Sequence, residues 1–556
     1  MRRRGRRRST FAPSAGGLGH VRWLETVERP RRRRPPLVPI LLLALVVAAA
    51  GGAAWILLAR EAAGDRRQEV AERFSAAWAR GDLPAMWRLL TPERRRDWPL
   101  AEFTASYRIA NEQATVRAVR PGPVAEPAGG VARVRVSVRT RDFGVLRGPI
   151  DLRIADRDGE PLLDWSPAWR LPGLREGENV RRRVLKRPDR RPILAADGSR
   201  LEDVPAAAAI VGAPPAGGEP GTGLEGRYDQ RLGGRPGAEL RFGRRVVERV
   251  AVRRGRALRT TLSPRLQRVA TEALGGRLGG VAVLRPRTGN VLAAAGIALS
   301  GPQPPGSTFK IVTLAAALQE RVASRASSYP VQTAATLSGV RLRNASDEAC
   351  GGSLANSFAH SCNSVFGPLG AELGARRLVR YAEAFGFNEA PRLPGEEPST
   401  IPEPAELKDD LAVGAAAIGQ ERDLSTTLQM ASVGATIANR GLRVRPRLVR
   451  GERMQRRRVV SRRVADQVRD MMVGVVRGGT GGAAAVPGVE VAGKTGTAEL
   501  RPTAGGPIDP KNTDAWFVAF APASRPTVAV AVMLVSAGQG GATAAPVARE
   551  VLAAAL

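Results

Sequence analysis

The sequence predicts a multidomain chain with one N-terminal transmembrane helix, a small α+β domain, a short β-rich segment and a large α/β domain. Three observations support this architecture. Residues 37–59 carry no charge, valines alternate with polar residues between 133 and 139, and helix and strand patterns succeed one another from residue 259 onward. At 556 residues the chain is long enough for several domains and at least one large core.

The first 59 residues have the pattern of a membrane anchor. Residues 1–36 contain twelve arginines and two glutamates, which predicts a disordered basic tail. The 23 uncharged residues from 37 to 59 would form about 35 Å of helix, enough for a hydrocarbon core of about 30 Å. Because arginines crowd the N-terminal flank, we expect a single-pass cell-membrane protein with a cytoplasmic N-terminus and the remainder outside. The alternative is a cleaved signal peptide, for which the apolar run is too long.

Residues 60–172 have the pattern of a small α+β domain. Val70, Phe74 and Trp78 recur at four-residue spacing, which indicates the apolar face of a helix. The alternating valines between 133 and 139 indicate a half-buried strand. Helices followed by an antiparallel sheet resemble the NTF2-like cone, and we expect this domain to act as a spacer rather than as a ligand pocket.

Residues 259–556 predict one large α/β domain. Ser263 and Pro264 have the chemistry of an N-cap and of a first helical position, so a helix is expected over 263–274. Apolar runs bounded by turn residues predict further strands and a closing helix. The strands are expected over 280–284, 290–294, 489–493, 514–520 and 527–534, and the helix over 545–556.

The composition excludes several classes of function. The formal charge is +34, but only five of the 86 basic residues are lysines, so the excess reflects a bias toward arginine. Aromatic residues make up 4% of the chain, too few for a nucleic-acid platform, and we favour an anionic membrane or wall surface as the partner for this charge. With two histidines, His20 and His360, a His-based triad and a His-rich metal site are nearly excluded. We expect neither metal nor cofactor.

Three short motifs follow one another in the α/β region. They are Ser307-Thr308-Phe309-Lys310, Ser361-Cys362-Asn363 and Lys494-Thr495-Gly496-Thr497. Ser307 follows a Gly/Pro-rich run and opens an apolar stretch, which predicts a loop that turns into a buried helix. Residues three apart share a helix face, so Lys310 can touch Ser307. Lysine, unlike arginine, can give up its proton when burial and a nearby cation lower its pKa, and so can serve as a base.

This order of SxxK, SxN and KTG motifs resembles the signature of the penicillin-recognising serine acyl-transferases. Residues 190–198 and 223–234 resemble two segments of the pedestal, or dimerisation, domain of high-molecular-mass penicillin-binding proteins. Residues 370–387 and 417–441 resemble helical segments of their transpeptidase domain. No stretch between anchor and pedestal fits a glycosyltransferase, so the chain is identified as a class B, monofunctional penicillin-binding protein of the actinobacterial type.

The resemblance implies a pedestal at 173–258 and a β-lactamase-like transpeptidase domain at 259–556, with a five-stranded antiparallel sheet flanked by helices. It also implies a peptidoglycan D,D-transpeptidase that cross-links D-Ala-D-Ala stem peptides through a serine acyl-enzyme and is inhibited by β-lactams. Ser307 would be the nucleophile, Lys310 the base, and Ser361 a proton relay to the leaving amine. The residues expected to bind the substrate are Asn363, Lys494, Thr495, Gly496 and Thr497.

Two of these implied roles involve the backbone. The N–H groups of Ser307 and Thr497 would form the oxyanion hole. Gly496 would let the substrate backbone approach the strand, because it has no side chain in the way.

Cys350 and Cys362 are the two cysteines of the chain. Outside the membrane they would lie in an oxidising compartment, and their separation of twelve suits a small-loop disulfide. Such a bond would brace the loop that carries Ser361 and Asn363.

The expected partners are stem peptides, β-lactams, the membrane, and a SEDS-family glycosyltransferase with other cell-wall proteins. One alternative is a membrane-bound β-lactamase or β-lactam sensor, since both share the SxxK and KTG motifs. Others are a non-catalytic component of a cell-wall complex and a basic protein that binds anionic wall polymer. The SxN motif and the pedestal segments argue against a secreted β-lactamase, and the intact motifs argue against a non-catalytic role.

Overall fold

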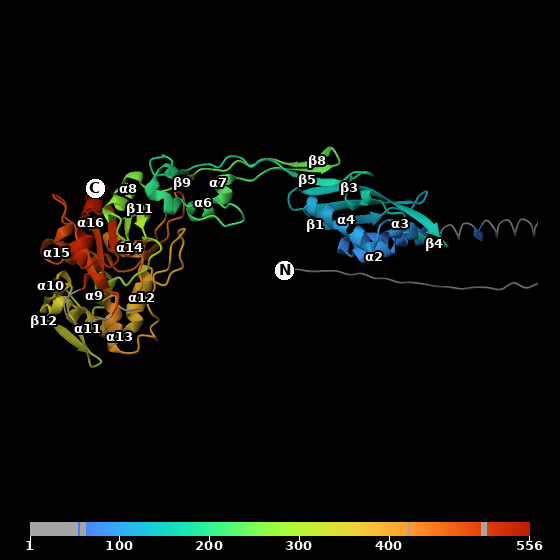
Figure 1. Ribbon diagram of the computed structural model, residues 1–556. Coiled ribbons are helices and arrows are strands. Elements are labelled where there is room, and N and C mark those ends of the chain that lie inside the picture. The colour runs from blue at the N-terminus through green and yellow to red at the C-terminus, as the bar shows by residue number, and fades with distance from the viewer. Residues whose placement is uncertain (1–53, 56–62, 421, 502–508) are drawn as a thin grey trace, which may run out of the picture. The chain divides into compact units, whose positions relative to one another are not determined.

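The computed structural model describes residues 54–55, 63–420, 422–501 and 509–556 (Figure 1). The predicted tail at 1–36 and all but two residues of the predicted span at 37–59 lie outside this range. Among the described residues, none of the helices combines the length and the apolar character needed to cross a bilayer. The described residues divide into two compact units, one that ends at residue 181 and includes 242–244, and one that contains the described residues of 182–241 and 245–556.

The first unit consists of helices followed by an antiparallel sheet. A helix covers residues 63–80, followed by α2 (Leu83–Arg88), α3 (Pro92–Asp97) and α4 (Leu100–Gln113). The sheet has the order β1-β2-β3-β4, with β1 (Val116–Val124), β2 (Val131–Thr140), β3 (Val145–Arg157) and β4 (Glu160–Leu163). A 3₁₀ turn, η1 (Pro167–Arg170), follows the last strand.

The core of this unit is aromatic. Phe74 and Trp78 are buried on the first helix, and side chains of β2 alternate between buried and solvent-facing positions, so both predictions are confirmed. Trp165 packs against the rings of Phe103 and Tyr107 and donates its indole N–H to the Tyr107 hydroxyl at 3.2 Å. The hydrogen bond satisfies the polar edge of an otherwise apolar cluster.

The segment before the large domain combines short strands with short helices. Strands β5 (Val180–Val184), β7 (Ala238–Phe242) and β8 (Arg245–Val250) form one sheet, and β6 (Ile193–Leu194) pairs in parallel with β9 (Leu258–Arg259). The helical turns are η2 (Leu201–Asp203), η3 (Pro205–Ala207), α5 (Ala208–Val211), α6 (Gly223–Arg227) and α7 (Asp229–Gly233). Arg190 forms ion pairs with Glu225 and Asp229, so the two segments predicted to belong to a pedestal contact each other.

The large domain is built on the predicted five-stranded antiparallel sheet, which is confirmed. Its order is β11-β10-β20-β19-β18, so β18 is an edge strand. The strands are β10 (Gly279–Arg285), β11 (Asn290–Gly296), β18 (Ala492–Glu499), β19 (Thr513–Ala521) and β20 (Val528–Leu534). The long helices are α8 (Pro264–Leu274), α9 (Lys310–Gln319), α11 (Asn363–Leu373), α12 (Ala375–Phe385), α14 (Thr427–Ala438), α15 (Arg462–Gly478) and α16 (Gly540–Ala555).

Shorter elements fill the rest of this domain. They are η4 (Gly306–Phe309), α10 (Leu354–Ala359), α13 (Asp410–Ala417), η5 (Ala345–Asp347), η6 (Gly482–Ala484) and η7 (Pro510–Asn512). Three two-stranded ribbons pair β12 (Ser328–Gln332) with β15 (Cys350–Ser353), β13 (Ala334–Leu337) with β14 (Val340–Arg343), and β16 (Leu442–Val444) with β17 (Arg456–Arg458).

Helices cover both faces of the sheet. Helices α8 and α16 lie side by side on one face, although they are far apart in the sequence, and α9 and α14 belong to the core on the other face (Figure 1). Side chains of β20 alternate between the two cores: Val530 and Val532 face α16, whereas Ala529 and Ala531 face α14. Both faces of the sheet are therefore dry, and its strands read as continuous apolar runs.

Two predicted boundaries are wrong. The strand expected over 489–493 begins at Ala492 and continues to Glu499, so the KTG motif lies within β18 rather than after it. The closing helix begins at Gly540, five positions before the predicted start at residue 545. A Cβ at Gly540 would lie 2.2 Å from the carbonyl oxygens of Gly496 and Trp516, so the helix start is glycine because it packs directly on the strand backbones.

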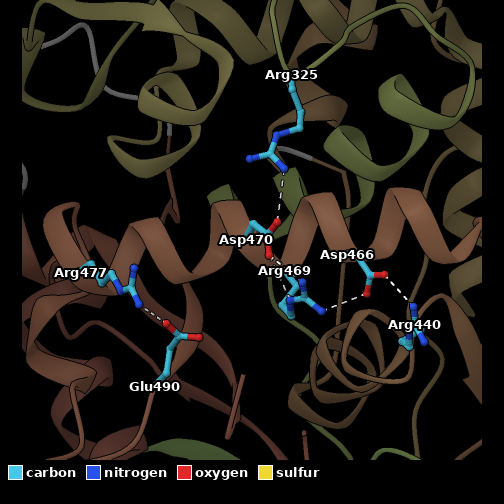
Figure 2. Close-up of polar contacts among 7 residues, drawn as sticks. All are labelled: Arg325, Arg440, Asp466, Arg469, Asp470, Arg477 and Glu490. Atoms are coloured by element: carbon cyan, nitrogen blue, oxygen red, sulfur yellow. Dashed lines mark hydrogen bonds and ion pairs between the residues drawn. The ribbon is translucent and has the colours of Figure 1, made fainter. Parts of the chain in front are cut away.

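Helix α15 is fixed to its surroundings by both of its faces. Its apolar face is buried against β18, α9, α10 and α14. Its polar face forms ion pairs that Figure 2 shows, with partners in three other parts of the chain. They join Asp466 to Arg440 and Arg469, Asp470 to Arg325 and Arg469, and Arg477 to Glu490. Exposed pairs contribute little singly, so the packed face provides most of the stability.

We predict opposite effects for two Gly→Ala substitutions on helices. Gly540→Ala should destabilise the large domain by about 1–3 kcal/mol, since the new methyl would overlap two backbone oxygens. Gly474→Ala in α15 meets no atom within 4 Å and should stabilise it by up to about 1 kcal/mol. Denaturant unfolding of the two variants tests this, and equal effects would contradict the packing argument.

Candidate active site

Ser307 and Lys310 lie where a 3₁₀ turn runs into a buried helix, as predicted. Ser307 belongs to η4, and Lys310 is the first residue of α9, a helix in which nine of ten residues are buried. The Lys310 amine lies 3.0 Å from the Ser307 hydroxyl. The turn is held from behind by a hydrogen bond of 2.8 Å from the Gly306 N–H to the Gly419 carbonyl.

The Lys310 amine is surrounded by oxygen atoms of the second motif. It lies 2.7 Å from the Ser361 carbonyl oxygen and 2.6 Å from the Asn363 side-chain oxygen, with the Ser361 hydroxyl at 3.3 Å. Ser361 has a left-handed backbone with φ of 62°, which is uncommon for a residue other than glycine. This conformation lies between α10 and α11 and presents both oxygens of Ser361 to the same amine.

Lys494 joins the same cluster from the edge strand. Its amine lies 2.9 Å from the Ser361 hydroxyl and 3.0 Å from the Thr495 carbonyl. Ser361 therefore lies between the two lysines, and the structure brings all three motifs together. The motifs come from the η4–α9 junction, the α10–α11 turn with the start of α11, and β18, which are far apart in the sequence.

Both lysines are buried away from opposite charge. Each is 0% exposed, and no carboxylate lies within ion-pair distance of either amine in the described part of the chain. Burial and the charge of Lys494 lower the pKa of Lys310 well below its usual range. Burial also lowers the pKa of Lys494 to about 7. The ring of Phe366 lies 5.7 Å from the Lys310 amine and that of Phe358 lies 5.6 Å from the Lys494 amine, and such rings favour a cation only weakly.

The remaining residues of the third motif face the start of α16 and the η4 turn. The Thr495 hydroxyl lies 2.6 Å from that of Thr480, and the Thr497 hydroxyl accepts the Gly540 N–H at 3.4 Å. Gly496 has a packing role, while its predicted role toward the substrate stays a prediction. A Cβ there would lie 2.9 Å from the Pro305 carbonyl and 3.0 Å from Trp516 Cβ, so its lack of a side chain lets β18 pack against the protein's own turn.

Asn363 is held by residues that the motif search missed. Its amide nitrogen donates to the Arg343 carbonyl at 2.8 Å, which leaves its oxygen to face Lys310. The next residue, Asn344, is buried and its oxygen accepts the N–H of Ser364 at 2.8 Å, directly after Asn363. Its amide nitrogen donates to the carbonyls of Gln332 and Glu348, both at 2.8 Å. Asn344 thus fixes the start of α11.

Two further residues border the site. Thr480 follows α15. Its N–H donates to the Ala359 carbonyl at 3.2 Å, and its hydroxyl forms a hydrogen bond with the hydroxyl of Thr495. Gln420 donates to the Thr497 carbonyl at 3.4 Å. Each is a single polar residue in a loop, and nothing in the local sequence pattern distinguishes it.

The structure joins Cys350 and Cys362 in a disulfide with a Cα–Cα distance of 5.5 Å. The bond links β15 to the residue between Ser361 and Asn363. It fixes the SxN turn covalently at Cys362, between the two functional residues Ser361 and Asn363.

We predict that the buried lysines make stability depend on pH. The folded pKa of Lys494 is about 7, whereas the pKa of an unfolded lysine is about 10.4. Between these values the unfolded chain binds a proton that the folded chain lacks, so the free energy of unfolding rises with pH. The Tm should therefore rise from about pH 7 to about pH 9, and rise less in Lys494→Met than in Lys408→Met, which removes an exposed lysine. The same pH response in both variants would contradict the assignment.

Comparison with known proteins places this geometry in a family. Residues 279–553 match the family model described as the penicillin-binding protein transpeptidase domain. Peptidoglycan D,D-transpeptidase PbpA of Mycolicibacterium smegmatis is 36% identical over 404 residues, covering 60% of this chain and 79% of that protein. The PbpA of Mycobacterium tuberculosis is 35% identical over 386 residues, covering 57% and 76%.

Solved structures agree with the sequence comparison. The crystal structure of PBPA from Mycobacterium tuberculosis superposes with a TM-score of 0.57 at 30% identity, covering 66% of this chain and 99% of that one. Its imipenem acyl-enzyme complex gives a TM-score of 0.56 at 29% identity, covering 66% and 98%. Together with the convergence of the three motifs, these likenesses establish that the chain belongs to the class B penicillin-binding protein transpeptidases.

Proposed function

We propose that this protein is a peptidoglycan D,D-transpeptidase that cross-links stem peptides through an acyl-enzyme on Ser307. The observation that carries the proposal is the environment of the Lys310 amine. A neutral amine has two N–H donors and one lone pair. The Ser361 carbonyl and the Asn363 oxygen, at 2.7 and 2.6 Å, accept the two hydrogens, so the lone pair faces the Ser307 hydroxyl at 3.0 Å.

Acylation follows from this arrangement. The Ser307 oxygen attacks the carbonyl of the penultimate D-Ala, and its proton passes to the Lys310 amine. The N–H groups of Ser307 and Thr497 stabilise the oxyanion of the tetrahedral intermediate. When the peptide C–N bond breaks, the proton moves through the Ser361 hydroxyl to the leaving D-Ala amine. The product is an ester between Ser307 and the donor peptide.

Transfer reverses the proton path. The amine of a second stem peptide attacks the ester carbonyl and gives up a proton to the Ser361–Lys310 pair. The ester C–O bond then breaks, and the Ser307 oxygen leaves and takes the proton back. Lys494 and the hydroxyls of Thr495 and Thr497 bind the terminal carboxylate of the donor. An anion at this point favours the charged form of Lys494, which would raise its pKa when substrate is bound.

Asn363 and Gly496 complete the substrate-binding set. The Asn363 amide binds the peptide backbone of the donor, and Gly496 allows the edge strand to lie against the nucleophile turn. β18 has a strand neighbour on one side only, so the donor peptide adds along its free edge. β-Lactams occupy the same place and acylate Ser307.

The domain organisation and partners form part of the proposal. The regions are a cytoplasmic tail at 1–36, a transmembrane anchor at 37–59, an NTF2-like spacer at 60–172, a pedestal at 173–258 and the transpeptidase domain at 259–556. The order of helices and sheet in the first unit supports the spacer, and the ion pairs of Arg190 support the pedestal. The enzyme acts at the outer face of the cell membrane, beside a SEDS-family glycosyltransferase that supplies glycan strands and with other cell-wall proteins.

Labelling with a fluorescent penicillin tests the nucleophile and the base. We expect stable labelling of the wild type, none of Ser307→Ala, and normal labelling of Ser324→Ala, which alters an exposed serine. Lys310→Arg keeps a cation that cannot deprotonate, and acylation should slow by about 10²–10⁴-fold.

The same experiment separates the transpeptidase from its main alternative. Retention of the label supports a transpeptidase, whereas rapid loss would show a β-lactamase. Labelling of Ser307→Ala at the wild-type rate would contradict the acyl-enzyme assignment.

We also predict that Asn344 acts on the reaction through Asn363. Asn344→Ala removes three hydrogen bonds and frees the start of α11, so the Asn363 oxygen should no longer hold the Lys310 amine. The acylation rate should fall by roughly tenfold, a loss of about 1.4 kcal/mol in transition-state stabilisation. Asn439→Ala, which removes an amide bonded to a backbone carbonyl in another turn, serves as the control for stability.

The pH profile distinguishes positioning from general destabilisation. Loss of the Asn344 contact should change the pH dependence of acylation, since the environment of Lys310 changes. The Asn439→Ala variant should keep the wild-type profile. Equal losses of acylation in the two variants would contradict a positioning role for Asn344.

A further inference from the structure

A pocket lies away from the Ser307 cluster, where the proposed pedestal meets the transpeptidase domain. Its volume is about 410 Å³, within the range of small-molecule sites. Its wall includes the end of α6, the segment 391–394 and the segment 445–455. None of the three catalytic motifs contributes to it. We call it the arginine pocket, because its charged lining residues are Arg227, Arg392, Arg445, Arg447, Arg453 and Glu452.

Some of the arginines of this pocket have a carboxylate partner and others have none: Arg445 pairs with Glu389. Within the described parts of the chain, Arg227, Arg392 and Arg453 form no side-chain ion pair. Arg447 donates to two neutral oxygens, the Asn290 side chain at 2.8 Å and the Glu452 carbonyl at 2.7 Å. Ion-paired arginines occur elsewhere in this arginine-rich protein, as on α15, where Asp466 pairs with Arg440 and Arg469 (Figure 2).

The carboxylates of Glu452 and Glu389, near the pocket, already have hydrogen-bond or ion-pair partners. The Glu452 carboxylate accepts the Tyr228 hydroxyl at 2.9 Å. Glu389, the partner of Arg445 at 3.3 Å, also forms two hydrogen bonds with Arg443. Burial lowers the pKa of Arg445. The charges of Glu389 and Glu396 raise it, whereas repulsion from Arg392 and Arg443 lowers it, so groups of both signs surround this arginine.

We propose that the arginine pocket binds a phosphate-bearing ligand. Three of the five arginines, Arg227, Arg392 and Arg453, have no ion-pair partner in the described chain. An occupant with more than one negative charge or several acceptor oxygens matches them, and a phosphate group supplies both. The planar guanidinium groups match phosphate oxygens in pairs. The volume exceeds that of a lone ion, so the ligand carries an organic part, which Tyr228 and the prolines of the wall contact.

Two sources of this chemistry exist in a cell envelope, a soluble phosphorylated glycan or polyol and the headgroup of an anionic phospholipid. Both present a phosphate ester, and one design distinguishes them. The full-length protein in a neutral detergent is titrated by calorimetry with glycerol 3-phosphate and, separately, with phosphatidylglycerol in mixed micelles. Glycerol and phosphatidylcholine are the uncharged and zwitterionic comparators.

Two double variants remove the same charge from different places. The pocket variant, Arg227→Gln with Arg453→Gln, removes two exposed arginines from the rim of the arginine pocket. The control variant, Arg268→Gln with Arg549→Gln, removes two exposed arginines from α8 and α16. We expect the pocket variant to bind roughly tenfold more weakly or not at all, and the control to stay within about twofold of the wild type. Added salt should weaken wild-type binding. Penicillin labelling of Ser307 shows that each variant is folded, and Arg453→Gln alone replaces the double variant if it is not.

Each outcome bears on the proposal. Pocket-dependent binding of glycerol 3-phosphate alone assigns a soluble ligand, and pocket-dependent binding of phosphatidylglycerol alone assigns a lipid headgroup. If the wild type binds neither probe, or if both double variants lose the same affinity, the arginine pocket is not a phosphate site.

Discussion

The buried amine of Lys310 is the constraint on which the rest of the catalytic domain depends. To act as a base it must be dry, neutral and aimed at Ser307. Helix α9 provides the dryness, because nearly every one of its residues is packed in the core. The SxN turn provides the aim through two short contacts, and the cation of Lys494 favours the neutral form of its neighbour. Removing any one of these leaves a lysine that is merely buried.

Such a site is costly to fold. Two lysines are fully buried with no carboxylate partner in the described chain, and one serine has a left-handed backbone. The surrounding structure offsets these costs with a sheet that is dry on both faces, a disulfide at the SxN turn and the hydrogen bonds of Asn344. The unfavourably buried charges and the strained backbone are thus concentrated at the functional site, whereas the scaffold around it follows ordinary packing rules.

The order of the motifs and the apolar periodicity carried most of what the sequence could predict. Ser307, Lys310, Ser361, Asn363 and Lys494 stand in motifs that the structure brings to one place, and the sheet strands read as apolar runs. Asn344, Thr480 and Gln420 were missed because a single polar loop residue has no periodic pattern; its meaning arises from contacts across the fold. The strand at 489–493 was misplaced since Val489 and Val491 mimic its apolar start, and the register depends on pairing with β19.

The edge position of β18 limits how this protein can change in evolution. Successive residues of a strand point to opposite faces, so an inserted or deleted residue between Ala492 and Lys494 would turn every later side chain to the other face. The amine would leave the cluster, and a hydroxyl or a bare backbone would take its place. Residues along β18 can be replaced by others of similar volume, but the number of residues in the strand cannot change. Length variation in this family should therefore accumulate outside the eight residues of this strand.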